Sequence, residues 1–314
     1  MTAQERRNLF LHLFTLPAII LIAVYLYYPI FDNAYLSLFD IRNFNLQQGA
    51  FVGFENYSKL FRDPIFWRAM RNTVVMLVAT VFIQLPIAFL LADALANHVH
   101  EKHRRLEAWL LLFLFIPVVM PTPVLAKTWR LFFTGMHGAG YGPFEWMAVN
   151  FGIEEEITQF LGTETVLLLG EVKIAFWVVV AVQTWARIGF NLLIYRSAIL
   201  SIPAEIYESA EIDGAGPWTK LLRITIPLGR NVIGATIVLA ILGVFQLFDM
   251  VWLITAGGGL GGGPLNTTHL LATYMYTRAF VDLRTGYGAA IAITILVAAL
   301  SLSFIQRRLF PEST

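Results

Sequence analysis

The sequence predicts an all-α membrane protein with six transmembrane helices, and two properties of its composition carry this prediction. Of the 314 residues, 57% are apolar and only 14% are charged, whereas about 25% of the residues of a soluble domain are charged. The mean hydropathy is +0.66. Because a single soluble core stops growing near this chain length, the lipid bilayer is the expected solvent for so much apolar surface.

The first apolar run, Leu13–Phe39, follows Arg6 and Arg7 and begins like a signal peptide. It is too long for the apolar part of a signal peptide and contains no cleavage site of small residues. We therefore expect a first transmembrane helix that is retained.

The other five runs each hold the roughly 20 mainly apolar residues that a spanning helix requires. The third is expected to be broken by Pro117, Pro121 and Pro123, because proline removes a helical hydrogen bond and clashes with the preceding turn. The five expected helices are Thr73–Leu95, Leu106–Phe133, Ile174–Leu200, Val232–Thr255 and Tyr287–Ile305.

The distribution of lysine and arginine around these helices predicts the orientation of the chain. With the N-terminus inside the cell, the cytoplasmic segments carry more Lys and Arg residues than the outer ones, as is usual for cytoplasmic loops. We therefore expect both termini to lie in the cytoplasm. The predicted organisation is a cytoplasmic segment at 1–12, a transmembrane domain at 13–306 that includes a polar loop at 201–230, and a cytoplasmic tail at 307–314.

Several function classes are excluded by what the sequence lacks. A net charge of +1 gives no electrostatic case for nucleic acid. With no cysteine and six scattered histidines, disulfides, Fe–S clusters and a metal site are not expected. The Gly-rich run at 256–264 lacks the Gly-Lys-Ser/Thr of a phosphate-binding loop, so any ATP is hydrolysed by another chain. No catalytic constellation is present, and we expect neither an enzyme nor a cofactor in this chain.

The polar loop contains a patterned segment between Pro203 and Pro227. Residues 204–212 form a predicted short helix, since Pro203 suits a helix start and Gly214 suits the left-handed residue that follows a helix end. A second helical pattern follows, and we expect Pro227 to introduce the fifth span. Such a unit, exposing apolar and acidic side chains, either meets a protein partner or folds back on its own helical bundle, and the residues alone favour neither.

The spacing within this segment resembles the EAA loop of permeases from binding-protein-dependent ABC importers. The family pattern is Glu-Ala-Ala, three residues, Gly, nine residues, Ile, any residue and Leu-Pro. Here Glu208-Ser209-Ala210 precede Gly214, and Ile224 is followed by Ile226-Pro227 at the same spacing. Ser209 and Ile226 are conservative departures.

The resemblance implies the location, the fold and the partners of this chain. The location would be the bacterial plasma (inner) membrane. The fold would be that of a type I ABC importer permease, and the short helix would be the cytoplasmic coupling helix that docks on an ATPase. Its coupling residues would be Glu208, Ser209, Ala210, Asp213 and Gly214. The implied partners are a second permease in a heterodimer, two ATPase subunits or domains that bind ATP and Mg, and an extracytoplasmic solute-binding protein.

Further segments resemble the first permease of the carbohydrate-uptake group, the maltose and glycerol-phosphate type. This resemblance implies transport of a sugar. Two departures are an expanded Gly run at 257–264 and Asn231 at a position where proline is usual. The segments that carry the resemblance are Tyr28-Pro29-Ile30, Phe51–Tyr57, Asn72-Thr73, Trp185, Phe245–Asp249, Gly262-Gly263-Pro264, Tyr276 and Ala279-Phe280.

Polar residues inside the predicted spans suggest a solute pathway, because such residues usually face a cavity or a partner. Gln183, Arg187 and Asn191 recur at four-residue spacing and share one face of the fourth helix. Gln246 and Asp249 share a face of the fifth. By resemblance, the sugar pocket of maltose-type permeases lies on these two spans.

The aromatic residues near this polar stripe suit a sugar, which stacks on rings and forms hydrogen bonds around its rim. They are Trp177, Trp185, Phe190 and Phe245, and Phe190 lies one turn beyond the positions that match the family's pocket.

Three alternatives remain open at this point. Arg187 and Asp249 can instead pair to hold helices together. Arg187 would also suit an anionic solute such as a uronate, a sugar phosphate or glycerol phosphate. An ion-coupled secondary transporter would explain the spans and the buried charges. The acidic segment Phe144–Thr165 and the Gly-rich loop are the expected surfaces for the binding protein.

Overall fold

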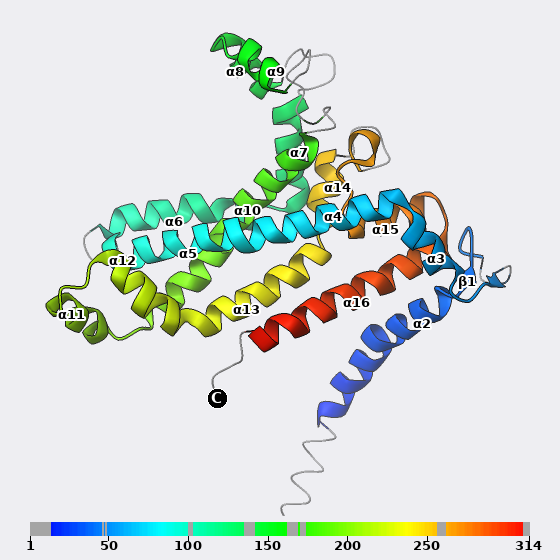
Figure 1. Cartoon of the computed structure of the whole chain (residues 1–314), viewed down its shortest axis with the longest axis horizontal. Coiled ribbons are helices and arrows are strands. Elements are labelled where there is room, and N and C mark those ends of the chain that lie inside the picture. Colours follow the sequence, from blue (N-terminus) through cyan, green and yellow to red (C-terminus); the bar gives the residue numbers. More distant parts are fainter. Residues whose placement is uncertain are drawn as a thin grey trace, which may run out of the picture. The chain divides into compact units, whose positions relative to one another are not determined.

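The computed structural model describes residues 14–45, 47, 49–99, 103–134, 142–161, 169, 174–255 and 262–309. It is a protein of long helices (Figure 1). The chain divides into two compact units, which are described separately. The first unit comprises Met1–Asp63 and Met275–Val297, and the second comprises Pro64–Tyr274 and Ala298–Thr314.

The first unit contains the N-terminal helix, a short hairpin and the helices that follow it. The N-terminal helix runs from Phe14 to Leu36, and it ends before the predicted Phe39 because that residue enters a strand. The hairpin is the exception to the all-α prediction within the described residues. The elements of this unit are η1 (Ala23–Tyr27), α2 (Tyr28–Leu36), β1 (Phe39–Asp40), β2 (Ala50–Phe51), α3 (Glu55–Arg62), η7 (Thr277–Val281) and the first part of α16 (Thr285–Leu309).

The buried amide of Asn56 holds this hairpin against α3. Its Nδ2 donates to the carbonyl oxygens of Ser37 and Phe39, at 2.8 and 2.9 Å. The hydroxyl groups of Tyr57 and Ser37 lie 2.8 Å apart. Gly53, at φ +57°, makes the turn between the strand and the helix. These contacts give the Phe51–Tyr57 segment a structural role.

The second unit holds most of the long helices. Within the described residues, five helices of the chain are long and apolar enough to cross a membrane, and a bent helix pair makes a sixth if it is one span. The elements of this unit are α4 (Pro64–Ala79), η3 (Thr80–Gln84), α5 (Leu85–Ala94), η4 (Leu95–Val99), α6 (Arg104–Val119), α7 (Thr122–Thr134), α8 (Pro143–Asn150), α9 (Glu154–Leu161), α10 (Ala175–Leu200), α11 (Ala204–Ile212), α12 (Pro217–Lys220), η5 (Leu221–Thr225), α13 (Ile226–Phe245), α14 (Asp249–Thr255), η6 (Pro264–Asn266) and α15 (Leu271–Tyr276).

The helix bounds agree with the sequence prediction in the fourth and sixth spans and differ in two others. The second span begins at Pro64, before the predicted Thr73. The prediction for the fifth span was wrong at both ends, because one helix runs from Pro217 to Phe245. Pro227 therefore lies inside a helix and does not introduce one.

Three prolines are accommodated in the same way. Pro29, Pro86 and Pro227 each stand two residues beyond a five-residue π-helical turn, η1, η3 or η5. A helical proline has no N–H to donate and its ring clashes with the carbonyl four residues earlier. The wider π turn contains that carbonyl in each case, so the helix continues past the proline.

At the centre of the second unit, α10 packs against α5 and α6 (Figure 1). A Cβ atom on Gly189 would lie 2.1 Å from the carbonyl oxygen of Leu114, so α10 and α6 touch backbone to backbone. An ion pair between Arg196 and Glu107 joins the same two helices, with only 19% and 6% of the two side chains exposed. These contacts make α6 and α10 a tightly joined pair.

The Asn72-Thr73 dipeptide ties α4 to the loop before α15. Asn72 Nδ2 donates to the carbonyl oxygens of Thr267 and His269, at 2.7 and 3.0 Å. Thr73 Oγ1 accepts the N–H of Leu271 at 3.0 Å. The dipeptide therefore fixes the residues that follow the Gly-rich run.

Candidate functional site

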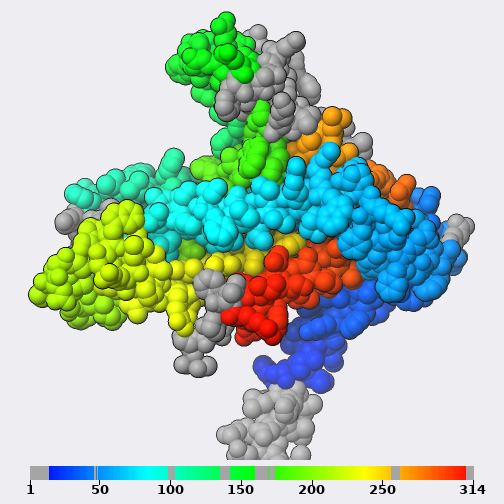
Figure 2. Space-filling view, viewed as in Figure 1, coloured from blue at the N-terminus to red at the C-terminus, as the bar shows by residue number. Residues whose placement is uncertain are grey.

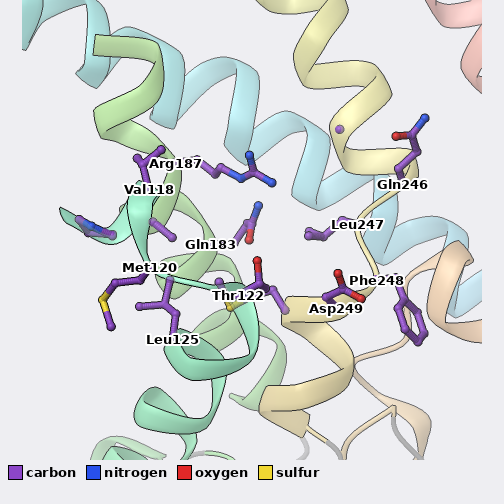
Figure 3. Close-up of a pocket in the computed structure, with 14 residues that line it drawn as sticks. Val118, Met120, Thr122, Leu125, Gln183, Arg187, Gln246, Leu247, Phe248 and Asp249 are labelled. Carbon is purple, nitrogen blue, oxygen red and sulfur yellow. The ribbon is translucent and has the colours of Figure 1, made fainter. Parts of the chain in front are cut away.

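A cavity of about 280 Å³ lies within the second unit where two helices are interrupted. Its walls come from the α6–α7 break, from one face of α10 and from the α13–α14 break (Figure 3). The lining residues are Pro117, Val118, Met120, Thr122, Leu125, Gln183, Ala186, Arg187, Gly243, Gln246, Leu247, Phe248, Asp249 and Met250.

The predicted break in the third span is confirmed at Pro121, whereas Pro117 lies inside α6 and Pro123 in the first turn of α7, so the prediction of a break at these two prolines was wrong. The helices α6 and α7 meet at 99°. Met120 is extended, at φ −69° and ψ 134°, because the residue before a proline is driven out of the helical region. The N–H groups of Val124 and Leu125 bind the carbonyl oxygen of Pro121 and start α7. The first turn of α7 therefore opens on the cavity.

The break between α13 and α14 was not predicted. Gln246 ends α13, with its N–H bound to the carbonyl oxygen of Leu242 at 3.1 Å, and Asp249 begins α14. The prediction that Gln246 and Asp249 share a face of one helix was wrong. No proline or glycine lies between them. The break instead coincides with the packing of α14 against α7, where Met250, Val251 and Ile254 are buried.

Of the six predicted pathway residues, four line this cavity: Gln183, Arg187, Gln246 and Asp249. Gln183 is only 8% exposed, yet its amide forms no hydrogen bond with the described residues. Figure 3 shows the side chains of Gln183, Arg187, Thr122 and Asp249 gathered around one space. Within the described ranges, Arg187 and Asp249 form no ion pair with each other or with another side chain.

The remaining predicted residues lie elsewhere. Phe190 is 42% exposed and does not line the cavity. Asn191 is buried, and its Nδ2 reaches the carbonyl oxygen of Arg187 at 3.4 Å. The long α10 face therefore contributes only its first two polar residues.

The aromatic residues expected beside the solute also pack elsewhere. Trp185 meets the edge of Trp129 at 5.3 Å between ring centroids, and Phe245 is 4% exposed in the core. The aromatic residue in the cavity wall is Phe248, which stacks on Trp252 at 5.5 Å. Sequence reasoning did not identify Phe248 or Thr122 as site residues, although the prolines had marked the break beside Thr122.

The predicted helix at 204–212 is present as α11 and ends in a glycine cap. Gly214 has φ +78°, its N–H binds the carbonyl oxygen of Glu211 at 3.0 Å, and the N–H of Ala215 binds that of Ala210 at 2.8 Å. This is the Schellman arrangement. A Cβ atom on Gly214 would meet nothing within 4 Å, so the position needs glycine for its backbone angle and not for space.

Two side-chain contacts hold α11 against the helix that follows it. The hydroxyl groups of Tyr207 and Thr225 lie 3.1 Å apart, and Lys220 binds Glu211. In the space-filling view, α11 and α12 form an exposed lobe of their unit (Figure 2). Ile212 and Trp218 are 87% and 69% exposed, so the lobe does not fold these side chains back on the bundle.

The other predicted coupling residues lie on the surface of this lobe. Glu208, Ser209 and Asp213 are exposed, and Ala210 is half-buried. Glu208 also lines a second cavity of about 390 Å³, between α11 and the ends of α10 and η4. Its carboxylate forms no ion pair with the described residues.

The acidic segment beyond α7 forms α8 and α9. Glu154, Glu155 and Glu156 occupy the first turn of α9, where carboxylates favour a helix. Trp146 and Phe151 are 57% and 73% exposed. The expected N-terminal segment at 1–12, the Gly run at 256–261 and the end of the tail at 310–314 lie outside the described residues.

Comparison with known proteins gives a family match over most of the chain. Residues 84–313 match the family described as binding-protein-dependent transport system inner membrane component. The chain is 30% identical over 299 residues to the probable ABC transporter permease protein YurN of Bacillus subtilis (strain 168), covering 95% of both chains. It is 32% identical over 298 residues to the lactose transport system permease protein LacF of Rhizobium radiobacter, covering 94% of this chain and 91% of that one.

A further relative is the sulfoquinovosyl glycerol transport system permease protein SmoG of Agrobacterium fabrum (strain C58 / ATCC 33970), at 30% identity over 299 residues. The aligned region covers 93% of this chain and 87% of the relative. Among solved structures, a bacterial ABC transporter involved in the import of the acidic polysaccharide alginate has a chain with a TM-score of 0.78 and 22% identity. The match covers 98% of this chain and 96% of that one, and it establishes the fold.

Proposed function

Because this chain belongs to the family of binding-protein-dependent transport system inner membrane components, it is a permease of an ABC importer, and we propose that it carries a sugar across the plasma membrane. Relatives named for the transport of lactose and of sulfoquinovosyl glycerol support a sugar. The two termini are proposed to lie in the cytoplasm.

The observation that carries this proposal is the cavity with Gln183, Arg187, Gln246 and Asp249 in its wall. Polar and ionisable groups inside spanning helices are unfavourable and tend to mark a solute path. Here they have no ion-pair partner among the described residues. A sugar matches such a wall, since its hydroxyl groups donate to carboxylate and amide oxygens and accept from guanidinium and amide N–H groups. Phe248 adds an apolar surface for a sugar ring.

The mechanism that fits this family is alternating access driven by partner subunits. We infer that two ATPase subunits or domains bind ATP and Mg and act on the lobe of α11, with Glu208, Ser209, Ala210, Asp213 and Gly214 as the coupling residues. The capped helix, tied to η5 by Tyr207, would pass motion directly into α13. A second permease would complete the path, and a solute-binding protein would deliver the sugar, with α8 and α9 as the docking surface.

Two other functions have specific observations in their favour. Arg187, which has no ion-pair partner among the described residues, suits an anionic solute. The helix breaks at the cavity are typical of ion-coupled secondary transporters, whose half-helices meet at a central site. The lobe of α11 favours the ATP-driven machine, because a secondary transporter has no use for a rigid cytoplasmic contact with an ATPase.

The experiment that tests the proposal reconstitutes this chain in lipid with its partner permease, ATPase and binding protein. We expect one sugar of a panel, added with the binding protein, to stimulate ATP hydrolysis and to accumulate inside vesicles only when ATP is present. Uptake by this chain alone, without ATP and driven by an ion gradient, would establish the secondary transporter instead.

A further inference from the structure

We propose that the start of α7, together with Gln183 and Arg187, forms a subsite for the acidic group of the transported sugar, so that the solute is a sugar acid. This inference rests on the proposed sugar transport and extends it, since it assigns the chemical class of the solute. The group recognised is an oxyanion: a carboxylate, sulfate or phosphate carried on a sugar ring.

The first turn of α7 offers a positive helix end to the cavity. A helix N-terminus carries roughly half a positive elementary charge, from N–H groups that lack partners. In α7, which has 13 residues, Pro123 has no N–H, and Val124 and Leu125 donate to Pro121. The N–H and the hydroxyl of Thr122 form no hydrogen bond with the described residues, and Thr122 lines the cavity. Two donors at this helix end are therefore available to an anion.

Gln183 independently indicates a ligand at the same place. More than nine-tenths of this residue is buried, and its amide has no hydrogen-bond partner among the described residues. Its amide atoms retain access to the cavity, so a ligand there can reach them. Its side chain and that of Thr122 point into the same space (Figure 3). The amide N–H groups of Gln183 would complete the ring of donors around an oxyanion.

The charged residues that line the cavity indicate that the ligand carries a negative charge. Arg187 has no carboxylate partner among the described residues, and guanidinium groups match planar oxyanions with two parallel hydrogen bonds. Asp249 lies on the opposite helix break, in the first turn of α14. It forms no ion pair with Arg187. The charge of Arg187 is thus left for the solute, while Asp249 remains an acceptor for hydroxyl groups.

The cavity size agrees with a small solute. At about 280 Å³, it lies just below the roughly 300–1,000 Å³ of ligand pockets. One sugar ring with its acidic group at Thr122, Gln183 and Arg187 would place its hydroxyl groups toward Gln246 and Asp249. The same site would hold a neutral sugar less tightly, because the positive groups would then be desolvated without an anion.

The test measures binding to the assembled importer in lipid nanodiscs, with no binding protein present. Equilibrium dialysis would compare radiolabelled glucuronate with glucose, and galacturonate with galactose. Glucose 6-phosphate and glucose 6-sulfate would report which oxyanion is preferred. We expect at least one acidic sugar to bind at least tenfold more tightly than its neutral counterpart, and Arg187→Gln to remove the difference.

Two variants add a competing carboxylate without removing a fold contact. Thr122→Asp places a carboxylate in the first turn of α7, where it suits the positive helix end, and Gln183→Glu places a charge among the donors. Each should weaken acidic-sugar binding at least tenfold. The matched control is Thr134→Asp, the same change at the far end of α7, which should bind as the unaltered protein does.

The removal of the opposing carboxylate completes the test. Asp249→Asn should tighten the binding of the acidic sugar severalfold. Equal binding of acidic and neutral sugars, no binding of any acidic probe, or unchanged binding in Thr122→Asp and Gln183→Glu would overturn the subsite. An importer that accumulates a neutral sugar with ATP would overturn it as well and leave the proposed function standing, whereas an ATPase that no delivered solute stimulates would remove the proposed function.

Discussion

The hydroxyl group of Tyr207, on α11, lies 3.1 Å from that of Thr225, which is fully buried in η5. This contact joins the exposed lobe to the helix that continues as α13 up to the cavity wall. A second contact, between Lys220 and Glu211, lies one turn further along the same face of α11. The two contacts make the lobe a rigid extension of α13.

Replacing Tyr207 with phenylalanine should loosen that connection. The change removes one hydrogen bond, which contributes about 0.5–1.5 kcal/mol, and keeps the ring. We expect the assembled importer to hydrolyse ATP at a near-normal rate while solute uptake per ATP falls severalfold. Tyr35→Phe is the control, because Tyr35 is 61% exposed and its hydroxyl group forms no hydrogen bond with the described residues. An unchanged ratio in Tyr207→Phe would contradict the mechanical role of the contact.

Gly214→Ala tests the backbone requirement of the α11 cap. The left-handed conformation costs a residue with a Cβ atom about 1–2 kcal/mol, which changes a conformational equilibrium by about 5–30-fold. Uptake should fall within that range while the chain still inserts in the membrane. Gly216→Ala is a matched control, since both glycines have open space around them but Gly216 has φ −73°. Equal uptake by the two variants would show that the cap is not needed.

Glu208→Lys should abolish uptake without affecting insertion. Glu208 is exposed on the lobe, so reversing its charge disturbs a surface and not the core. Uptake and ATPase assembly would be measured side by side. Glu205→Lys, a change to another exposed carboxylate of α11 outside the motif, should leave uptake near normal. Normal uptake by Glu208→Lys would remove this residue from the coupling set.

Glu107→Gln should destabilise the second unit. Removing one member of a buried ion pair leaves the other charge unpaired, which costs about 3–5 kcal/mol. The melting temperature of the purified chain in detergent should fall clearly. Glu55→Gln breaks an exposed pair with Lys59, in which 53% and 52% of the side chains are exposed, and should change stability by no more than about 0.5 kcal/mol. Similar melting temperatures for the two variants would show that Arg196 finds another partner.

Alanine at Glu154, Glu155 and Glu156 tests the docking surface. The carboxylates on α9 would attract a basic surface of the binding protein and speed its approach. We expect the variant to need about tenfold more binding protein for half-maximal ATPase stimulation, with the same maximal rate. A stronger dependence on salt in the unaltered protein would support the same role. No change in the half-maximal concentration would place the docking surface elsewhere.

The sequence was sufficient to predict those features that depend on the backbone preferences of one or a few neighbouring residues. The start of α11 after Pro203 and its glycine cap at Gly214 follow from backbone preferences of single residues. The break beside Pro121 has the same origin. The six apolar runs were visible because a bilayer demands long continuous helices, and α10 matches the predicted fourth span almost to the residue.

The remaining features depend on contacts between distant segments. The α13–α14 break has no proline or glycine at its centre, and α14 gains its place by packing on α7. Pro227 is typical of a helix start, but the wider turn of η5 accommodates its ring, so the helix continues past it. The roles of Phe248 and Thr122 could not be read from spacing, because both depend on where two broken helices meet. Gln183 and Arg187 were found because α10 is unbroken across the cavity.

The backbone contact at Gly189 has a mechanical consequence. With Leu114 against Gly189 and Arg196 paired to Glu107, neither sliding nor rotation of α6 along α10 is possible without breaking a buried contact. The two helices should therefore act as one lever arm. The chain changes direction at Met120 and Pro121, which separate α6 from α7. A movement of this helix pair relative to α7 would change the distance between Thr122 and Gln183, which both line the cavity.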